Sequence, residues 1–146
     1  MRYWYSATIA NETGRCCSSS VESPWFSSTH IVSFSGFGAD AHGQDPTKAA
    51  VRACRNAIEF NQIPSLAKLL PNGNREELKL DVLLAVPAKY QRALEYDNIR
   101  QTFPYGQVRI QLQDGGMIAR HGLVIEEMGD TNEDMVVVCC AVTVGY

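Results

Sequence analysis

Residues 36–46 read GFGADAHGQDP, and this glycine-rich stretch joins two segments with different hydrophobic periods. Residues 30–36 alternate between apolar and polar side chains, which predicts a β-strand. Asp45 is suited to cap a helix and Pro46 to occupy its first position. Apolar and small side chains then recur at helical spacing up to Phe60: Ala50, Ala53, Cys54, Ala57 and Ile58. The stretch therefore predicts a strand, a loop and a helix that packs closely on a sheet.

The rest of the chain supplies three more strands and at least one more helix. Residues 78–86 begin alternating and end apolar on both faces, which predicts a strand whose second half is buried on both sides. Residues 88–102 predict a helix, and residues 64–73 predict a short helical piece that ends in a turn. Residues 107–113 alternate strictly and predict an outer strand. Residues 135–144 are the most apolar run and predict a central strand.

The order β-α-β-α-β-β predicts an α+β two-layer sandwich, with a four-stranded mixed sheet and two helices on one face. The second and fourth strands fit the central positions, and about 20 loop-like residues separate the last two strands. Residues 29–146 form a single domain in this interpretation. Residues 1–28 are serine-rich and have no period, so we expect a disordered or targeting-like N-terminal extension.

Composition and charge argue against several classes of protein. The chain has 146 residues, of which 45% are hydrophobic, and a formal net charge of −3 at pH 7. A protein that binds a phosphate backbone would carry a basic patch, so we expect no nucleic-acid partner. No apolar run reaches the roughly 18 residues that a membrane-spanning helix needs, so we expect no membrane partner.

The cysteines lack the spacing of a metal site or of a disulfide framework. They are Cys16, Cys17, Cys54, Cys139 and Cys140. Their number is odd, no CxxC occurs, and neighbouring strand residues point to opposite faces. We therefore expect reduced cysteines that act as small hydrophobic side chains. They fit a soluble protein in a reducing compartment, either the cytoplasm or, if residues 1–28 belong to a transit segment, a plastid.

The first candidate site is the loop between the first strand and the first helix. Asp40 and His42 place a carboxylate and an imidazole two residues apart, and a hydrogen bond between them would raise the basicity of the imidazole. We expect these two residues to form a catalytic acid–base pair. The amides before Thr47 would be free to bind an anion, with Lys48 nearby. Further expected ligand contacts are Gly36, Gly38, Gly43 and Asp45. The alternative is a tight structural turn whose polar groups cap the backbone.

The second candidate site follows the outer strand, where Asp114-Gly115-Gly116-Met117 precedes His121-Gly122. We expect Gly115 and Gly116 to contact a ligand and Arg109 to hold an anionic group, with a plain turn as the alternative.

A third glycine turn, Gly129-Asp130 with Asn132, is expected to be a plain connection. No GxSxG motif occurs, which argues against a Ser-His-Asp hydrolase. We also expect no metal ion and no cofactor.

Several motifs occur in a fixed order along the chain. They are GFGADAHG, which fits GxGxDxHG, then QDPTKAAVRACRNAI, LLAVP, FPYG, DGGM, GD and AVTV. With these motifs, residues 30–145 resemble the Lin-zero-five-one-two family of conserved hypothetical proteins. Its members occur in bacteria and, with long N-terminal extensions, in plastid-bearing eukaryotes. The family has no established activity, so the resemblance implies a fold and a site but no reaction.

A more distant similarity is to the Bacillus chorismate mutase-like fold, which has the same β-α-β-α-β-β order. Its members are often trimers with ligand clefts between subunits. Ring-opening amidohydrolases of the cyanuric acid hydrolase type resemble three such units in one chain, and their chemistry needs a Ser–Lys pair with the serine beside Gly-Gly. In this chain Asp114 precedes Gly115-Gly116, which argues against a serine nucleophile.

Two functions from different classes fit these residues. The first is a small-molecule-binding protein or enzyme whose site lies in the GxGxDxHG loop at a subunit interface. The second is a structural protein that assembles into rings or extended arrays without catalysis. A sheet with helices on one face leaves its other face uncovered, so we expect a homo-oligomer, either a trimer or a multiple of one.

Overall fold

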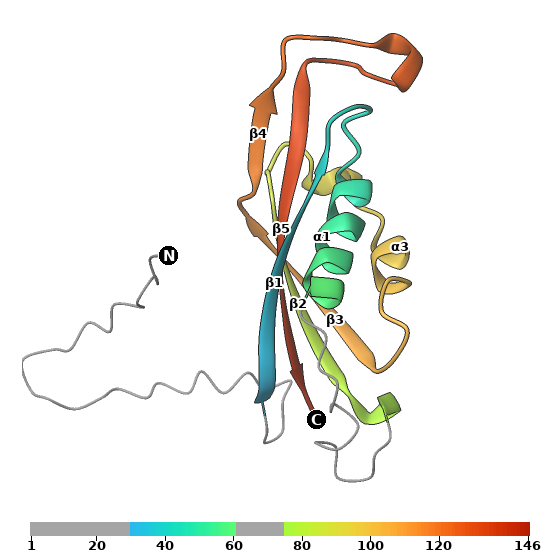
Figure 1. Cartoon of the computed structure of the whole chain (residues 1–146), viewed down its shortest axis with the longest axis vertical. Helices are drawn as coiled ribbons and strands as arrows, with labels where there is room; N and C mark the ends of the chain where they lie inside the picture. The colour runs from blue at the N-terminus through green and yellow to red at the C-terminus, as the bar shows by residue number, and fades with distance from the viewer. Residues whose placement is uncertain (1–29, 61–74) are drawn as a thin grey trace, which may run out of the picture.

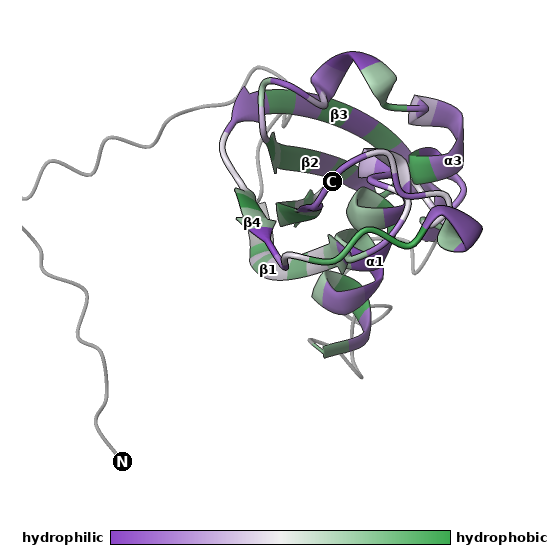
Figure 2. Cartoon of the chain, turned by 90° about the horizontal axis from the view of Figure 1, so that it is seen from above, coloured by the Kyte–Doolittle hydropathy of each residue, from purple (hydrophilic) through white to green (hydrophobic). Residues whose placement is uncertain are grey.

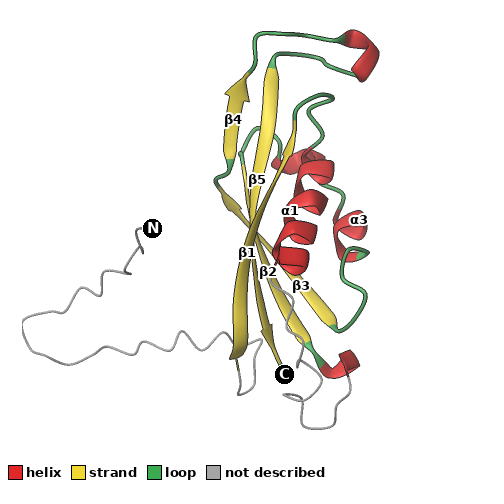
Figure 3. Cartoon of the chain, viewed as in Figure 1, coloured by secondary structure: helices red, strands yellow, loops and turns green. Residues whose placement is uncertain are grey.

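The computed structural model describes residues 30–60 and 75–146, which form a sheet covered on one face by helices (Figures 1 and 3). The predicted α+β two-layer architecture is therefore confirmed. The extension expected at residues 1–28 and the short helical piece expected at 64–73 lie outside the described residues. None of the helices in the described ranges is long and apolar enough to cross a membrane.

The sheet is mixed, as predicted. It consists of β1 (His30–Asp40), β2 (Lys79–Val86), β3 (Gln107–Asp114), β4 (Met117–Arg120) and β5 (Asp134–Gly145). The strand order is β1-β5-β2-β3, and β4 pairs with the start of β5. β2 and β3 run parallel, whereas the other pairs are antiparallel. β2 and β5 therefore hold the central positions, and β3 lies at an edge, as the sequence predicts.

Within residues 30–60 and 75–146 the sheet has five strands rather than the four expected from the sequence. The additional strand, β4, lies in the segment that was expected to be loop, and it pairs with residues 134–137 of β5. It is only four residues long and mostly exposed, so it lacks the apolar alternation that identifies a half-buried strand. Gly116, with φ of +69°, turns the chain from β3 into β4.

Helix α1 (Pro46–Phe60) begins where the sequence predicts. The Asp45 carboxylate accepts hydrogen bonds from the amides of Thr47 (2.8 Å) and Lys48 (3.1 Å), so Asp45 is the N-cap. The helix packs on β1 and β5. Most of the small side chains expected to face the sheet are fully buried: Ala50, Ala53, Cys54 and Ala57.

The second predicted helix, residues 88–102, is interrupted. A single 3₁₀ turn covers Gln91–Ala93, and the α-helix α3 covers only Tyr96–Arg100, beside α1. The hydroxyl of Thr47 on α1 donates to the carbonyl of Ala93 (3.4 Å) and accepts a hydrogen bond from the amide of Glu95 (3.1 Å). Because the Ala93 carbonyl and the Glu95 amide bond to Thr47, they are not available for the hydrogen bonds of one continuous helix.

Two glycines of the GxGxDxHG motif set the distance between β1 and α1. A Cβ atom built on Gly36 would lie 2.4 Å from the amide nitrogen of Ala57, and one built on Gly38 would lie 2.3 Å from the carbonyl oxygen of Ala49. Both contacts are far shorter than van der Waals distance, so a side chain at either position would push the helix off the sheet. These two glycines allow the small-residue stripe of α1 to reach the strand.

Among the described residues, no helix covers the sheet face opposite α1 and α3, which we call the open face (Figure 2). It carries cross-strand polar pairs, such as Ser33 with Thr143 (3.0 Å between the hydroxyl oxygens) and Gln111 with Asp81 (2.7 Å). It also carries Phe37, which is 66% exposed. The expected homo-oligomer that would cover this face stays a prediction.

Candidate functional site

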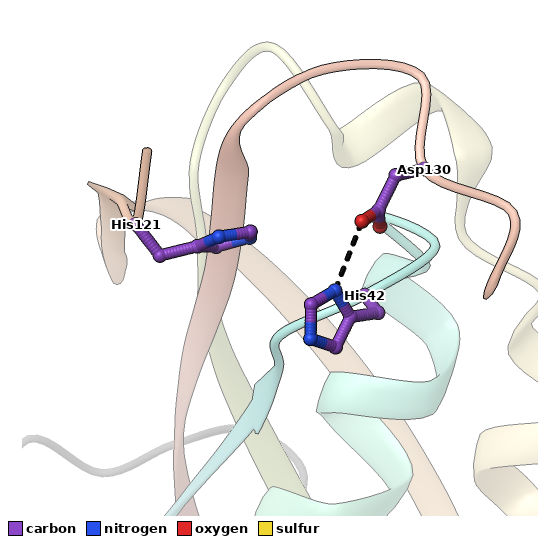
Figure 4. Close-up of side chains that lie close together, drawn as sticks. All are labelled: His42, His121 and Asp130. Carbon is purple, nitrogen blue, oxygen red and sulfur yellow. Dashed lines mark hydrogen bonds and ion pairs between the residues drawn. The ribbon is translucent and has the colours of Figure 1, made fainter. Parts of the chain in front are cut away.

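Two loops meet at the end of the sheet where β1 ends and β5 begins. Residues 41–45 connect β1 to α1, and residues 121–133 connect β4 to β5. Asp40, the last residue of β1, pairs with Val136 of β5, so the first loop lies beside the end of the second (Figure 1). This meeting point contains the GxGxDxHG loop and two residues from the β4–β5 loop, His121 and Asp130 (Figure 4).

Asp130 is the centre of this site. Its side chain is fully buried, and its Oδ1 accepts hydrogen bonds from the amide of Gly43 (2.7 Å) and the side-chain amide of Gln44 (3.0 Å). Its Oδ2 accepts a hydrogen bond from the amide of Ile125 (2.9 Å) and lies 2.9 Å from His42 Nδ1. The Ile125 amide, followed by His42, holds the pKa of the Asp130 carboxyl far below its usual range. Asp130 is therefore an ionised carboxylate that orients the two loops.

The hydrogen bond that His42 donates to Asp130 fixes the orientation of the His42 ring. An ionised carboxylate only accepts hydrogen bonds, so the Nδ1 atom of His42 carries the proton in this contact. In the neutral ring, Nε2 then keeps its lone pair. The His42 side chain is 27% exposed, so solvent and small molecules can reach it.

His121 lies next to His42, with the ring centroids 5.1 Å apart and the planes inclined at 69° (Figure 4). Its Nε2 atom is 3.0 Å from the carbonyl oxygen of Ala41. A carbonyl accepts hydrogen bonds only, so Nε2 of His121 is the protonated nitrogen and Nδ1 has the lone pair. The site thus presents two oriented imidazoles, each with one unprotonated nitrogen.

Asp40 has a different role from the one that its spacing suggested. Its carboxylate is buried; Oδ1 lies 3.0 Å from Arg52 and 3.1 Å from Lys48, and Oδ2 accepts the amide of Asp45 at 3.1 Å. The carboxylate bonded to His42 is therefore that of Asp130, whereas Asp40 fastens the loop to the first turns of α1. The cause is electrostatic, because two cations of α1 lie beside the end of β1.

Gln44 completes the connection between the two loops. Its side-chain oxygen accepts the amide of Thr131 (2.8 Å), and its side-chain nitrogen donates to Asp130 and to the carbonyl of Asn132 (3.2 Å). The backbone of Gln44 has a φ of +49°, a conformation that residues other than glycine rarely adopt. Such a backbone persists only where surrounding contacts compensate its cost, and it occurs often at functional sites.

The expectation of free amides before α1 is wrong. The amide of Gly43 donates to Asp130 and that of Asp45 donates to Asp40, so both are occupied. Asp45 caps the helix and also lines the pocket described next, and its expected contact with a ligand stays a prediction. Lys48 pairs with Asp40 and also lines an open polar pocket of about 400 Å³ beside α1 and α3.

The remaining predicted ligand contacts lie away from these loops. Gly36 and Gly38 face α1, as described above. Gly115 and Gly116 form the turn between β3 and β4, where a Cβ on Gly116 would lie 2.3 Å from a carbonyl oxygen of β5. Arg109 pairs in register with Asp81, which pairs with Thr143 in the second half of β5. At about 3.3 Å per strand residue, that position lies roughly 30 Å from the loop end of β5, which begins nine residues earlier at Asp134.

Sequence reasoning missed Asp130 and did not connect His121 with His42. The interpretation of Gly129-Asp130 as a plain connection is wrong, because this turn supplies the buried carboxylate of the site. One signal was present: His42, His121 and Asp130 each stand beside a glycine. These glycines all have positive φ, namely Gly43 (+93°), Gly122 (+73°) and Gly129 (+84°). Each of the three side chains is therefore presented from a tight turn.

Comparisons with known proteins support a fold and a family. Residues 30–144 match the model of a family described as "Conserved hypothetical protein (Lin0512_fam)". A solved structure from Nostoc punctiforme, described as an FtsZ-like protein of unknown function, is 34% identical and superposes with a TM-score of 0.71. That match covers 80% of this chain and 93% of the other. No curated protein matches. The distant similarity to the Bacillus chorismate mutase-like fold stays a prediction.

Proposed function

The chain belongs to the Lin0512_fam family of conserved hypothetical proteins, and from this premise we propose that it is a small-molecule-binding protein whose site lies between the GxGxDxHG loop and the β4–β5 loop. In this proposal His42 and His121 contact the ligand, and Asp130 is a positioning residue. One observation carries it: a buried carboxylate with donors on both oxygens holds an imidazole that solvent can reach.

The cost of burying a carboxylate supports this interpretation. A buried charge is expensive unless hydrogen bonds compensate it, and two amides and Gln44 already supply such bonds to Asp130. The bond to His42 goes further, because it fixes the tautomer and the direction of a ring at the surface. Assembly into rings or arrays does not require a buried carboxylate that orients a solvent-accessible imidazole. The alternative function is therefore not favoured.

The chemistry of the two imidazoles defines the ligand. Each ring keeps one unprotonated nitrogen, which can accept a proton or bind an electropositive centre. If a proton moves from the ligand to His42, the neighbouring Asp130 carboxylate stabilises the resulting imidazolium. The same geometry would then serve an enzyme, and turnover of the bound molecule would identify it as one.

The test is a thermal-shift screen of small carboxylates and cyclic amides, followed by calorimetry on each hit. A ligand at 100 times its Kd should stabilise the wild type by about 2.7 kcal/mol. His42→Gln should lose this stabilisation and melt normally without ligand, whereas Asp97→Asn, on the 92% exposed Asp97 of α3, should keep it. A ligand that binds His42→Gln as tightly as wild type, or a screen without any hit, would contradict the proposal.

A further inference from the structure

We propose that His42, His121 and Asp130 together bind a divalent transition-metal ion of the zinc class. One ligand atom from each residue lies within 4.8 Å of the others. This inference rests on the proposed function, because it assigns the electropositive centre that the two imidazoles hold. The small molecule would then bind through the metal.

The distances are close to those of a metal site. Zinc binds imidazole nitrogen at about 2.0–2.1 Å, so two ligands of a tetrahedral ion lie about 3.3 Å apart. His42 Nδ1 and Asp130 Oδ2 are 2.9 Å apart. An ion bound by both atoms would replace the proton that Nδ1 now donates to Asp130, because a metal ligand must be deprotonated. The widest separation, at most 4.8 Å, has to shorten by about 1.5 Å. His121 is exposed, so rotation of its side chain can supply this movement without disturbing the core.

The outer contacts of two of the three residues, His121 and Asp130, match those of metal ligands. Metal-bound histidines usually donate their second ring nitrogen to a carboxylate or a backbone carbonyl, which fixes the ring. His121 makes such a contact with Ala41. Metal-bound carboxylates are in turn hydrogen-bonded, as Asp130 is by the amides of Gly43 and Ile125. Further hydrogen bonds therefore hold two of the three proposed ligands in place.

The donor set also selects the metal and its open position. Two imidazoles favour zinc, copper, iron or nickel, whereas magnesium and calcium prefer oxygen ligands. Three protein ligands leave the fourth position of a tetrahedral ion open, as in catalytic rather than structural zinc sites. One carboxylate leaves a divalent site with a net positive charge. We therefore infer that the fourth ligand is water or a small anion, such as a carboxylate.

The test uses metal-free full-length protein titrated with zinc chloride by calorimetry, and with cobalt(II), whose visible absorption reports coordination. We expect one ion per chain. His121→Gln and His42→Gln should each weaken binding at least about tenfold, the lower end of the loss usual for disturbed metal sites. His30→Gln is the matched control, because His30 stands at the opposite end of β1, and it should leave binding unchanged.

Because His121 is exposed, the His121→Gln variant is expected to fold. It therefore keeps the test decisive even if a variant at the buried Asp130 fails to fold. The absence of binding, or equal binding by His121→Gln and wild type, would overturn the inference; the second result would point to cysteines instead. Adding a chelator to a protein–ligand complex separates the two proposals. If the small molecule still requires His42 but ignores the chelator, the metal inference fails and the proposed function stands. If zinc binds as expected but no small molecule binds, the metal inference stands and the proposed function fails.

Discussion

Asp130 and His42 are in direct contact, with 2.9 Å between Oδ2 and Nδ1, although 88 residues separate them in the chain. The contact follows from the pairing of β1 with β5, because His42 comes two residues after the end of β1 and Asp130 four residues before the start of β5. Antiparallel neighbours bring the end of one strand to the start of the other. The carboxylate that orients His42 therefore comes from the β4–β5 loop near the C-terminal end of the chain.

Replacing Asp130 by asparagine should destabilise the protein. An amide group presents a nitrogen donor where one carboxylate oxygen now accepts, so either the pair Gly43 and Gln44 or the pair Ile125 and His42 loses its acceptor. We expect Asp130→Asn to lower the Tm by several degrees in scanning calorimetry of the metal-free protein. Asp97→Asn, at an exposed position of α3, should leave the Tm unchanged. Equal Tm values for the two variants would show that the carboxylate is not needed.

Gly38→Ala should destabilise the fold through contact rather than through backbone conformation. Its new Cβ would lie 2.3 Å from the Ala49 carbonyl oxygen, which forces α1 away from β1 and should cost about 3 kcal/mol. Gly122→Ala is the contrasting variant, because nothing lies within 4 Å of its Cβ and only the positive φ opposes the change. We expect a loss of about 1 kcal/mol there. Urea denaturation measures both, and an equal loss in the two variants would contradict the close-packing explanation.

Stability should fall on the acid side partly because of Asp134. Hydrogen bonds from Lys89 (2.6 Å) and then Tyr90 (2.9 Å) lower the pKa of Asp134 in the folded state. Its stabilising contribution is therefore complete above the unfolded carboxyl pKa of about 4, and it is lost as the pH falls through the lower folded value. Asp134→Asn should melt below wild type at pH 7, and the difference should shrink below about pH 4. Parallel Tm curves at every pH would exclude this explanation.

Cys139 should react with alkylating reagents before Cys54 or Cys140. Cys139 is exposed on the open face of the sheet, whereas the thiols of Cys54 and Cys140 are buried with their sulfur atoms 3.7 Å apart. The contact with Cys54, together with burial, raises the pKa of Cys140 and keeps it protonated. Among the three described cysteines, peptide mass spectrometry after brief treatment with iodoacetamide should find label at Cys139 first. Labelling of Cys140 at the same rate would mean that β5 opens readily.

The open sheet face should mediate self-association. We predict a trimer or a multiple of one, because apolar side chains on this face gain free energy when another subunit covers them. Phe37 is 66% exposed there, so Phe37→Glu should shift the protein towards smaller species in light scattering at micromolar concentration. Ser35→Glu, on the same face of β1, tests whether charge alone has this effect. A monomeric wild type would contradict the prediction.

Periodicity predicts the elements whose side chains alternate or recur over many residues, such as α1, β2, β3 and β5. It misses β4, because four mostly exposed residues carry too little pattern. It also extends the second helix across residues that Thr47 holds from a distant part of the chain. The second failure shows that a tertiary contact can override a local preference.

The site illustrates the same limit. The sequence identified His42 as a candidate, yet it suggested Asp40 as the partner because that carboxylate is nearest along the chain. Lys48 and Arg52 hold Asp40 in the fold, and Asp130 takes its expected place beside His42. Spacing along one loop cannot reveal which carboxylate a second loop brings. The only sign of this arrangement that we find in the sequence itself is the glycine beside each of His42, His121 and Asp130.

The pairing of β1 with β5 has a consequence for the order of folding. It joins nearly the first and nearly the last of the described residues, so this contact closes a very long loop and is entropically among the most demanding in the protein. The GxGxDxHG loop is synthesised early, but it lacks its carboxylate until β5 has left the ribosome and paired. If the proposed site binds a ligand, that binding reports completion of the whole sheet, and a chain that ends before β5 would carry the entire motif without the Asp130–His42 contact.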